Sequence, residues 1–301
     1  MKILLNQRFG LGNQLFQYAA GLYFAEKYGA SLEIIREPER KAVSYGRPRP
    51  FLLAHFRIST PVRQRTFLDR VLRSKSRPVA VVTAPVRRLL GAYSHDPNFL
   101  IIGDFQPSLP VAGETSRVYL NGHFQAHQYA QNMEPRLRRE LDLREPPSGK
   151  NVETLNQIRN CECPVSLHLR LGDYTKYWDG RNLLPTTYYD NAIAAIRGIH
   201  PNPTFFIFSD DIASARHHFH KLERAIFVDQ NAESAAQEDL RLMSECRHQI
   251  TANSTFSWWG AWLNTNPEKI VVVPDPWQVS DHHADLIPPT WRRIQTQGST
   301  R

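Results

Sequence analysis

The stretch VSLHLRLGDY, residues 165–174, decides the fold that we expect for this chain. Apolar residues in it alternate with Ser166, His168 and Arg170, which is the period-two pattern of a strand with one apolar and one polar face. A glycine and an aspartate then break the pattern. Because ligands of open α/β sheets bind beyond the carboxyl ends of the strands, we expect His168 and Arg170 to face a binding site.

These two side chains suit a phosphate group. The guanidinium of Arg170 cannot lose its charge and offers a planar fork of donors, while His168 can donate to an oxygen or share a proton. The structural alternative is that Arg170 pairs with an acid and that His168 is a half-buried residue. We favour the phosphate site because other stretches of the chain indicate the same kind of ligand.

Strand and helix patterns alternate along the rest of the chain. Short apolar or β-branched runs predict further strands at residues 2–6, 32–35, 117–120, 203–208, 225–228, 249–252 and 270–273. Most of these runs are followed by a helical pattern after a short connection. This order predicts parallel, doubly wound sheets and therefore an α/β fold.

The length of 301 residues allows two compact domains. The clearest linker is Pro-Pro-Ser-Gly at residues 146–149, which predicts domains at 1–147 and 148–301. The three cysteines are an odd and sparse set, which favours a reducing compartment. The chain starts directly with a strand-like segment and has no apolar run of membrane-spanning length, so we expect a cytoplasmic protein.

The formal net charge of +8 favours anionic partners. Nucleic acid, an anionic membrane and a phosphate-bearing metabolite are the candidates, and no recognised nucleic-acid motif supports the first. Many basic residues lie between positions 36 and 88, several of them three or four residues apart. This spacing favours the solvated face of a helix, with peripheral contact to the inner face of the cytoplasmic membrane as the alternative.

A glycine turn, GLGNQ at residues 10–14, follows the first strand and leads into an apolar helix pattern. Such a helix start presents backbone N–H groups that can face an anion or a sugar hydroxyl. The spacing matches neither the dinucleotide fingerprint nor the Walker motif, so an ordinary nicotinamide or ATP site is not predicted. Asn13 and Gln14 can instead act as helix caps.

Polar residues also follow three other predicted strands. His123 follows one of them and either serves an acceptor pocket or packs. Asp210 follows another strand, and either Asp211 or Ser209 is expected to cap the next helix. The Asn-Ser-Thr run at 253–255 precedes a further helix, whose backbone amides predict a second anion site.

Five blocks of the sequence stand out: GLGNQLFQYA at 10–19, NGHFQ at 121–125, HLRLGDY at 168–174, FSDD at 208–211 and NSTFSWWGAW at 253–262. Taken together and in this order, they resemble the bacterial α1,2-fucosyltransferase family, glycosyltransferase family eleven. The last block is long and unusual in composition, so it carries most of the resemblance. The basic segment at about 36–113 has no matching block.

The resemblance implies a GT-B fold, in which two Rossmann-like domains face each other across a cleft. It implies GDP-β-L-fucose as the donor, bound by the carboxyl-terminal domain, and the 2-hydroxyl of a β-galactoside as the acceptor. It further implies inversion at the anomeric carbon and a role in surface polysaccharide or oligosaccharide synthesis. A fucosyltransferase of α1,6 or another linkage, and a GDP-sugar-binding protein without catalysis, are the alternatives.

The resemblance also implies roles by position. Arg170 would hold the β-phosphate, His168 would lie at the nucleotide end of the site, and Asp239 would accept from the guanine N1 and N2 hydrogens. Leu171 stands where a second arginine is frequent, which leaves Arg170 as the main cation there. The predicted set comprises catalytic Arg170, Asp173 and Asn13; donor-binding His168, Asp210, Asp239, Asn253, Ser254 and Thr255; and acceptor-side Gly12, Gln14 and His123.

Elementary chemistry agrees with this set. Departure of the nucleotide leaves negative charge on the β-phosphate, so fixed cations and N–H donors are needed there. No Asp-x-Asp element of the type that holds a metal for nucleotide sugars is present in the sequence, so no metal or cofactor is expected. The attacking hydroxyl benefits from a general base, for which Asp173 is the first candidate and Asp210 and His123 are weaker ones.

Overall fold

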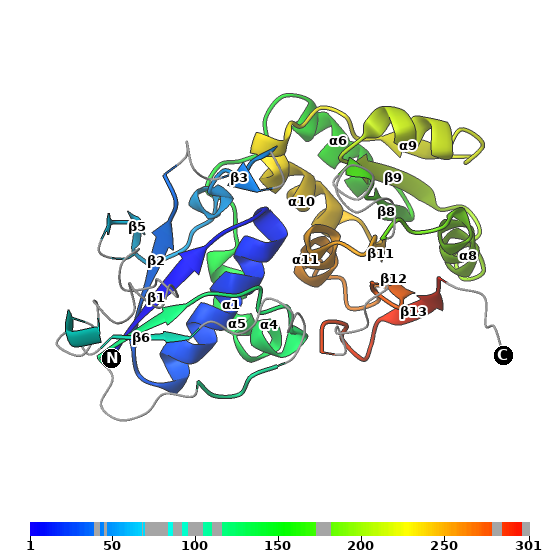
Figure 1. Cartoon of the computed structure of the whole chain (residues 1–301). Coiled ribbons are helices and arrows are strands. Elements are labelled where there is room, and N and C mark those ends of the chain that lie inside the picture. Colours follow the sequence, from blue (N-terminus) through cyan, green and yellow to red (C-terminus); the bar gives the residue numbers. More distant parts are fainter. Residues whose placement is uncertain are drawn as a thin grey trace. The chain divides into compact units, whose positions relative to one another are not determined.

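The computed structural model of the chain (Figure 1) describes residues 1–38, 43–44, 47–67, 69, 84–86, 92–95, 105–109, 116–172, 182–278 and 285–296. Residue contacts divide the chain into two compact units. Unit 1 consists of Met1–Asp142 and His282–Ile287, and unit 2 of Leu143–Asp281 and Pro288–Arg301. Each unit contains one parallel sheet with helices, so the predicted α/β fold is confirmed.

Unit 1 has a parallel sheet in the order β5-β2-β1-β7-β6. Its strands are β1 (Lys2–Gln7), β2 (Ser31–Arg36), β5 (Val62–Gln64), β6 (Ala92–His95) and β7 (Arg117–Leu120), with a separate antiparallel pair of β3 (Val43–Ser44) and β4 (Arg47–Pro48). Its helices are α1 (Leu11–Lys27), the short 3-10 turn η2 (Leu52–His55), α4 (His127–Asn132) and α5 (Glu134–Glu140).

Helix α1 is the main packing element of unit 1. Most of its residues are buried, among them Phe16, Tyr18 and Phe24, each at 0% exposure. Gly21 lets the helix approach the sheet closely, since a Cβ there would lie 3.0 Å from Leu5 of β1. Close packing of α1 therefore fixes where its first turn stands relative to the ends of the strands.

Unit 2 has a parallel sheet in the order β10-β9-β8-β11-β12-β13. Its strands are β8 (Pro164–Leu169), β9 (Thr204–Ser209), β10 (Ala225–Phe227), β11 (His248–Ile250), β12 (Val271–Asp275) and β13 (Arg292–Gln295). Its helices are α6 (Lys150–Arg159), α8 (Thr186–Arg197), α9 (Ile212–His218), η3 (Glu233–Ala235), α10 (Ala236–Glu245) and α11 (Thr255–Leu263).

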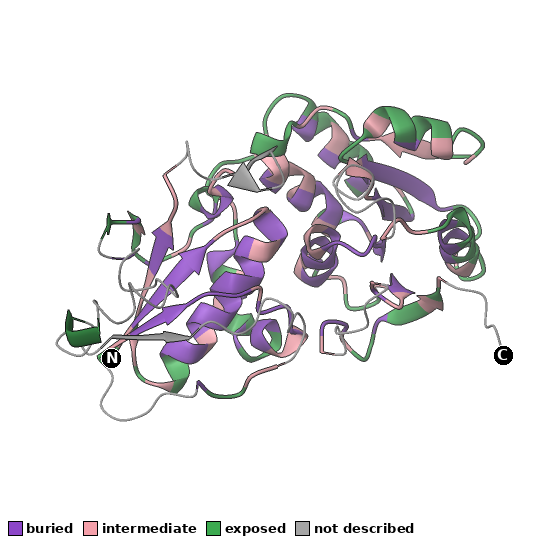
Figure 2. Ribbon diagram, viewed as in Figure 1, coloured by how far each residue is buried: buried purple, intermediate pink, exposed green. Residues whose placement is uncertain are grey.

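The sheet extends beyond the predicted core strand at 270–273, because the edge strand β13 follows it and pairs with β12. One expectation about this sheet is wrong. The central strand lacks a solvated polar face, because every residue of β8 is buried and both Ser166 and His168 are 3% exposed. Figure 2 shows β8 and β9 within the buried centre of the unit. Helices cover both faces of a parallel sheet, and alternation along one strand cannot reveal that.

The two faces of the unit 2 sheet carry separate apolar cores. Alternate residues of β8, including Leu167 and Leu169, pack with α8 residues such as Tyr189 and Ile196. The other face packs strand residues such as Phe206 against α6 and α10. Among the described helices, none has the length and apolar character needed to cross a membrane.

Candidate functional site

Both sheets contain a point where the strand order reverses, between β8 and β11 in unit 2 and between β1 and β7 in unit 1. The order in unit 2 is that of a doubly wound dinucleotide-binding domain, 3-2-1-4-5-6 when its strands are renumbered along the chain. Ligands of such sheets bind beyond the carboxyl ends of the strands at this switch point. Several of the predicted site residues that the structure describes lie at these two places.

In unit 2, the strand register brings Arg170 beside Asp210. Leu169 of β8 pairs with Ser209 of β9, so the residues that follow the two strands lie next to each other. Arg170 Nη1 lies 3.3 Å from Asp210 Oδ2, and the backbone N–H of Leu171 donates to Asp210 Oδ1 at 3.0 Å. Arg170 thus pairs with an acid, as the structural alternative expected, and its side chain keeps 21% exposure. The pair therefore fixes the guanidinium at the carboxyl end of β8.

The charge states at this point follow from burial and from the ion pair. Burial would raise the pKa of Asp210, but the Arg170 charge and the Leu171 amide hold it below its usual range. Burial, together with the Arg170 charge, lowers the pKa of His168 to about 3. At neutral pH this point therefore carries a carboxylate, a guanidinium and a neutral imidazole.

His168 is held as a buried hydrogen-bonding group. Its ring packs against Phe256 of α11, with 5.9 Å between ring centroids. In the part of the chain that the structure describes, its Nδ1 atom is buried and has no hydrogen-bond partner. Leaving such an atom without a partner is costly, so a ligand that supplied one would be favoured here.

The second predicted anion site lies at the start of α11, after β11 on the other side of the switch point. Ser254 is the N-cap, and its Oγ accepts from the Phe256 N–H at 3.3 Å. Asn253 donates to the carbonyl of Asn182 at 2.8 Å, which ties the turn to the segment before α8. The next residue, Thr255, begins the helix. A hydroxyl that accepts a cap bond can still donate, so Ser254 remains able to bind an anion.

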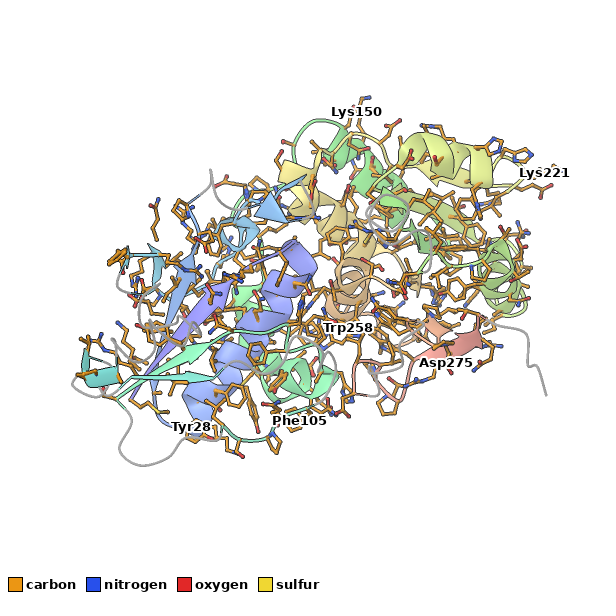
Figure 3. The ribbon with its side chains drawn as sticks, in the orientation of Figure 1. Tyr28, Phe105, Lys150, Lys221, Trp258 and Asp275 are labelled. Carbon is orange, nitrogen blue, oxygen red and sulfur yellow. The ribbon has the colours of Figure 1, made fainter. Side chains whose placement is uncertain are left out.

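Tryptophans anchor the start of α11 in the core. Trp258, labelled in Figure 3, is fully buried and contacts Trp259 and Trp291, with ring centroids 5.1 and 5.2 Å apart. A Cβ on Gly260 would lie 3.0 Å from Met243 of α10, so α11 and α10 approach closely at this glycine. The block NSTFSWWGAW therefore combines a polar helix start with the packing that positions it.

Asp239 lies in the first turn of α10 within a network of amides. Its Oδ1 accepts from Asn231 Nδ2 at 2.7 Å, and Asn231 exchanges hydrogen bonds of 2.9 Å with Asn151. Burial raises the pKa of Asp239 to about 7. Sequence reasoning missed the two asparagines, since Asn151 and Asn231 are 80 residues apart and no pattern joins them.

In unit 1, Asn13 contacts the loop that follows β7. Its Oδ1 accepts from Gln125 Nε2 at 2.6 Å and lies 3.4 Å from His123 Nδ1. Burial lowers the pKa of His123 to about 4, and its ring stacks on Phe9 at 4.6 Å. The capping alternative for Asn13 and Gln14 is wrong, because Gly10 is the N-cap of α1. Gln125 is part of the NGHFQ block, but the sequence alone predicted no role for it.

The remaining predicted residues differ in how far the structure describes them. Gln14 is buried and holds two loops, donating to Phe9 O at 2.9 Å and Pro50 O at 2.8 Å and accepting from Leu52 N at 3.1 Å. Gly12 is buried inside α1. Of the two expected cap candidates, Ser209 and Asp211, it is Asp211 that caps α9, accepting from Ser214 N at 3.1 Å. Asp173 lies outside the described residues, as does much of the basic segment 36–88.

A separate group at the amino ends of the unit 2 strands has ligand-type atoms within 4.8 Å of one another: Cys163, His200 and His248. The Ile270 N–H donates to His248 Nδ1 at 3.0 Å, and burial lowers the pKa of His248 to about 4. The neutral ring must therefore carry its hydrogen on Nε2, which leaves that nitrogen no lone pair for a metal. We do not count this group as a metal site.

The sequence matches the family model described as Glycosyl transferase family 11 over residues 102–295. The chain is 29% identical over 310 aligned residues to the Alpha-1,2-colitosyltransferase of Escherichia coli, covering 95% of this chain and 96% of that protein. It is 37% identical over 133 residues to the O-antigen biosynthesis glycosyltransferase WbnK of Escherichia coli, and this match spans 42% of this chain and 43% of that protein.

Among solved structures, the chain resembles the fucosyltransferase NodZ from Bradyrhizobium. The TM-score is 0.53 at 14% identity, over 87% of this chain and 91% of that one. A NodZ structure described as an alpha-1,6-fucosyltransferase co-crystallised with GDP gives a TM-score of 0.52 at 13% identity, over 87% and 91% of the two chains. At such identities the likeness concerns the fold, and it confirms the expected GT-B class.

Proposed function

We propose that this chain, which belongs to glycosyltransferase family 11, transfers L-fucose from GDP-β-L-fucose to the 2-hydroxyl of a β-galactoside. The observation that carries the proposal is the Arg170–Asp210 pair at the switch point of unit 2, beside the start of α11. A fixed cation next to helix amides is the arrangement that a departing diphosphate requires.

Unit 2 supplies the donor site in this proposal. Arg170 binds the β-phosphate, and the N–H groups at the start of α11 bind the diphosphate together with Ser254 and Thr255. Asp239 accepts from the guanine N1 and N2 hydrogens, for which its carboxyl must be ionised. His168, being neutral, acts as a hydrogen-bonding partner of the nucleotide and not as a charge.

The proposed reaction is a direct displacement with inversion and needs no metal or cofactor. The acceptor oxygen attacks the anomeric carbon of fucose while the bond to the β-phosphate breaks, and GDP leaves with the bonding electrons. A general base takes the proton of the acceptor hydroxyl. Asp173 is the proposed base, because Asp210 has a lowered pKa and is already paired with Arg170.

The donor and the linkage are the points that an assay must decide. One relative, whose match covers 95% of this chain, is named for colitose. Colitose is fucose without its 3-hydroxyl group. NodZ is described as an alpha-1,6-fucosyltransferase. A site that hydrogen-bonds a substrate hydroxyl rejects the analogue that lacks it. The rates of transfer from GDP-fucose and from GDP-colitose should therefore be compared directly.

The test is GDP release with each donor and a panel of galactosides that includes lactose, followed by NMR of the purified product. We expect GDP-fucose and a β-galactoside to give an α1,2-linked product. Binding of GDP without transfer to any acceptor would instead support a binding protein without catalysis. A product with another donor sugar or linkage would overturn the finer assignment.

We also propose that the protein acts in the cytoplasm, with peripheral contact to the inner membrane face through the basic segment 36–88. Cell fractionation tests the location. Sedimentation with anionic and with neutral vesicles tests the contact, which should weaken as the salt concentration rises because surface charges are screened.

A further inference from the structure

The side chain of Asn13 is held by two residues from a distant segment. Gln125 and His123 follow β7, whereas Asn13 lies in the first turn of α1, more than 100 residues earlier. Both contacts are made to the same atom, Asn13 Oδ1, at 2.6 Å from Gln125 Nε2 and 3.4 Å from His123 Nδ1. The three side chains meet at the switch point between β1 and β7.

These contacts set the direction of the Asn13 amide. An asparagine side chain accepts at its oxygen and donates at its nitrogen, so two donors on Oδ1 turn Nδ2 the other way. Gln125 is 7% exposed, and burial holds the pKa of His123 at about 4, so its ring stays neutral and can donate from Nδ1. The side of Asn13 that faces away from the β7 loop is therefore a hydrogen-bond donor.

The backbone that presents these residues is also unusual. Phe9 has φ +69° and Phe124 has φ +54°, in the left-handed region that bulky residues rarely adopt. Phe9 stacks on His123, its carbonyl accepts from Gln14, and the Phe124 carbonyl accepts from the Ala126 N–H at 2.9 Å. Such conformations persist only where their surroundings enforce them, and they cluster at functional sites.

We propose that Gln125 is a positioning residue, which with His123 fixes Asn13 so that its Nδ2 donates to an oxygen of the bound sugar. The inference rests on the proposed sugar transfer and deepens it. Under this proposal Asn13 Nδ2 donates to a hydroxyl or ring oxygen of the sugar. Gln125 sets the direction in which Asn13 donates.

Three variants test the direction. Asn13→Asp keeps an oxygen for Gln125 but replaces the outward donor by a carboxylate oxygen. Gln125→Glu replaces the donor by an acceptor, which draws Nδ2 of Asn13 inward. Gln125→Leu removes the contact without imposing a direction. We expect Asn13→Asp and Gln125→Glu to lower kcat/KM for the acceptor by roughly tenfold or more, and Gln125→Leu by less, because a mismatched buried polar pair costs more than a missing one.

The controls separate positioning from folding. Gln128→Leu removes another glutamine side-chain bond of unit 1, from Gln128 Nε2 to Asp285 Oδ1 at 3.0 Å, and should leave kcat/KM unchanged. The GDP affinity of every variant, measured by calorimetry, should equal that of the parent protein. Full activity of Gln125→Glu or of Asn13→Asp, with the fold intact, would overturn the proposal.

A second readout does not depend on transfer. In protein labelled with ¹⁵N-asparagine, the Asn13 side-chain amide is identified as the signal lost in Asn13→Asp. Its protons should exchange quickly with water in the parent protein, and more slowly in Gln125→Glu, where they bond to the glutamate. Slow exchange in both proteins would mean that Nδ2 already faces residue 125, and the proposal would be wrong even if the protein transfers fucose. If no donor is transferred, the proposed function fails, while this measurement still decides the direction of the amide.

Discussion

Each unit has a switch point in its parallel sheet, but the side chains that gather at the two points differ in chemistry. In unit 2, the residue after β8 is an arginine paired with a carboxylate at 3.3 Å, and a second carboxyl, Asp239, stands in the first turn of α10. In unit 1, the side chains that meet at the corresponding place are two amides and a neutral imidazole. The ion pair at the unit 2 switch point thus has neutral hydrogen-bonding groups as its counterpart in the Asn13 cluster of unit 1, where the charged residues at the strand ends, Arg8, Glu37 and Arg65, pair with one another.

This difference teaches where each kind of ligand fits. A diphosphate carries charge and gains from a fixed cation and helix amides, whereas a sugar presents neutral hydroxyls that need donors and acceptors of fixed direction. Each switch point also has a residue that orients another: Asp210 orients Arg170, and Gln125 orients Asn13. Changing one member of each pair tests whether the two switch points differ in this way.

The largest effect is expected from Arg170→Ala. Removing the cation on which the leaving phosphate depends should raise the barrier to transfer by about 3 kcal/mol, a loss of roughly 100-fold or more in kcat. Arg170→Lys should recover little, since a point charge does not replace a planar fork. The matched control is Arg216→Ala, which removes an exposed pair with Asp229 at 2.8 Å in the same unit. Steady-state kinetics measures kcat for both variants. Equal losses of kcat in Arg170→Ala and Arg216→Ala would contradict a special role for the Arg170 charge after β8.

The next largest effect concerns stability in unit 1. Gln14→Leu removes three bonds of 2.8–3.1 Å and leaves two carbonyls and one N–H without their partner. The free energy of unfolding should fall by about 2–4 kcal/mol, because unsatisfied buried polar groups are costly. Gln157→Leu, at an exposed position of α6, is the control and should change little. Urea denaturation measures the free energy of unfolding of both variants. A Gln14→Leu protein as stable as the parent would show that the Gln14 side chain does not stabilise the two loops.

The topology was predictable from sequence because strand and helix periods report local burial. The residues 117–120 were predicted as a strand and form β7, and the run 203–208 overlaps β9 closely. The burial of His168 was not predictable, since it depends on α11, which packs Phe256 against the ring from almost 90 residues away. The contact of Gln125 with Asn13 has the same origin, because only strand order brings β1 and β7 together.

A smaller effect, with a distinct pH signature, is expected at Asp239. Its pKa of about 7 means that the free protein loses the carboxylate as the pH falls below 7, so affinity for a guanine ligand should weaken up to about tenfold per pH unit there. GDP-fucose is the suitable ligand, since its diphosphate diester does not titrate near neutrality. Asp239→Asn should bind weakly at every pH and lose this dependence. The same affinity of the parent protein at pH 6 and pH 8 would be evidence against guanine recognition by Asp239.

Stability should change with pH in the opposite sense at this residue. A carboxyl whose pKa is raised by folding binds more protons in the folded state, so it lowers stability as the pH rises from about 4 to about 7. Asp239→Asn should therefore be more stable than the parent protein at pH 8, although it binds the donor less well. A melting temperature below that of the parent would show that the ionised carboxyl supports the fold.

The smallest effect is expected from Asp210→Asn, the counterpart of the Gln125 variants. Asparagine still offers an oxygen to the Leu171 N–H but loses the charge that faces Arg170, so the free energy of unfolding should fall by about 1–2 kcal/mol at pH 7. Folding lowers the pKa of Asp210, so its contribution is complete above the unfolded value near 4 and is lost as the pH falls through the folded value. The stability difference between parent and variant should therefore shrink below about pH 4. The Arg170–Asp210 pair keeps 21% and 14% exposure, so 1 M salt should reduce this difference slightly, whereas any change in the free energy of unfolding caused by Gln125→Leu, which removes a neutral hydrogen bond, should not depend on salt. Equal salt dependence of the two variants would remove the distinction between a charged and a neutral switch point.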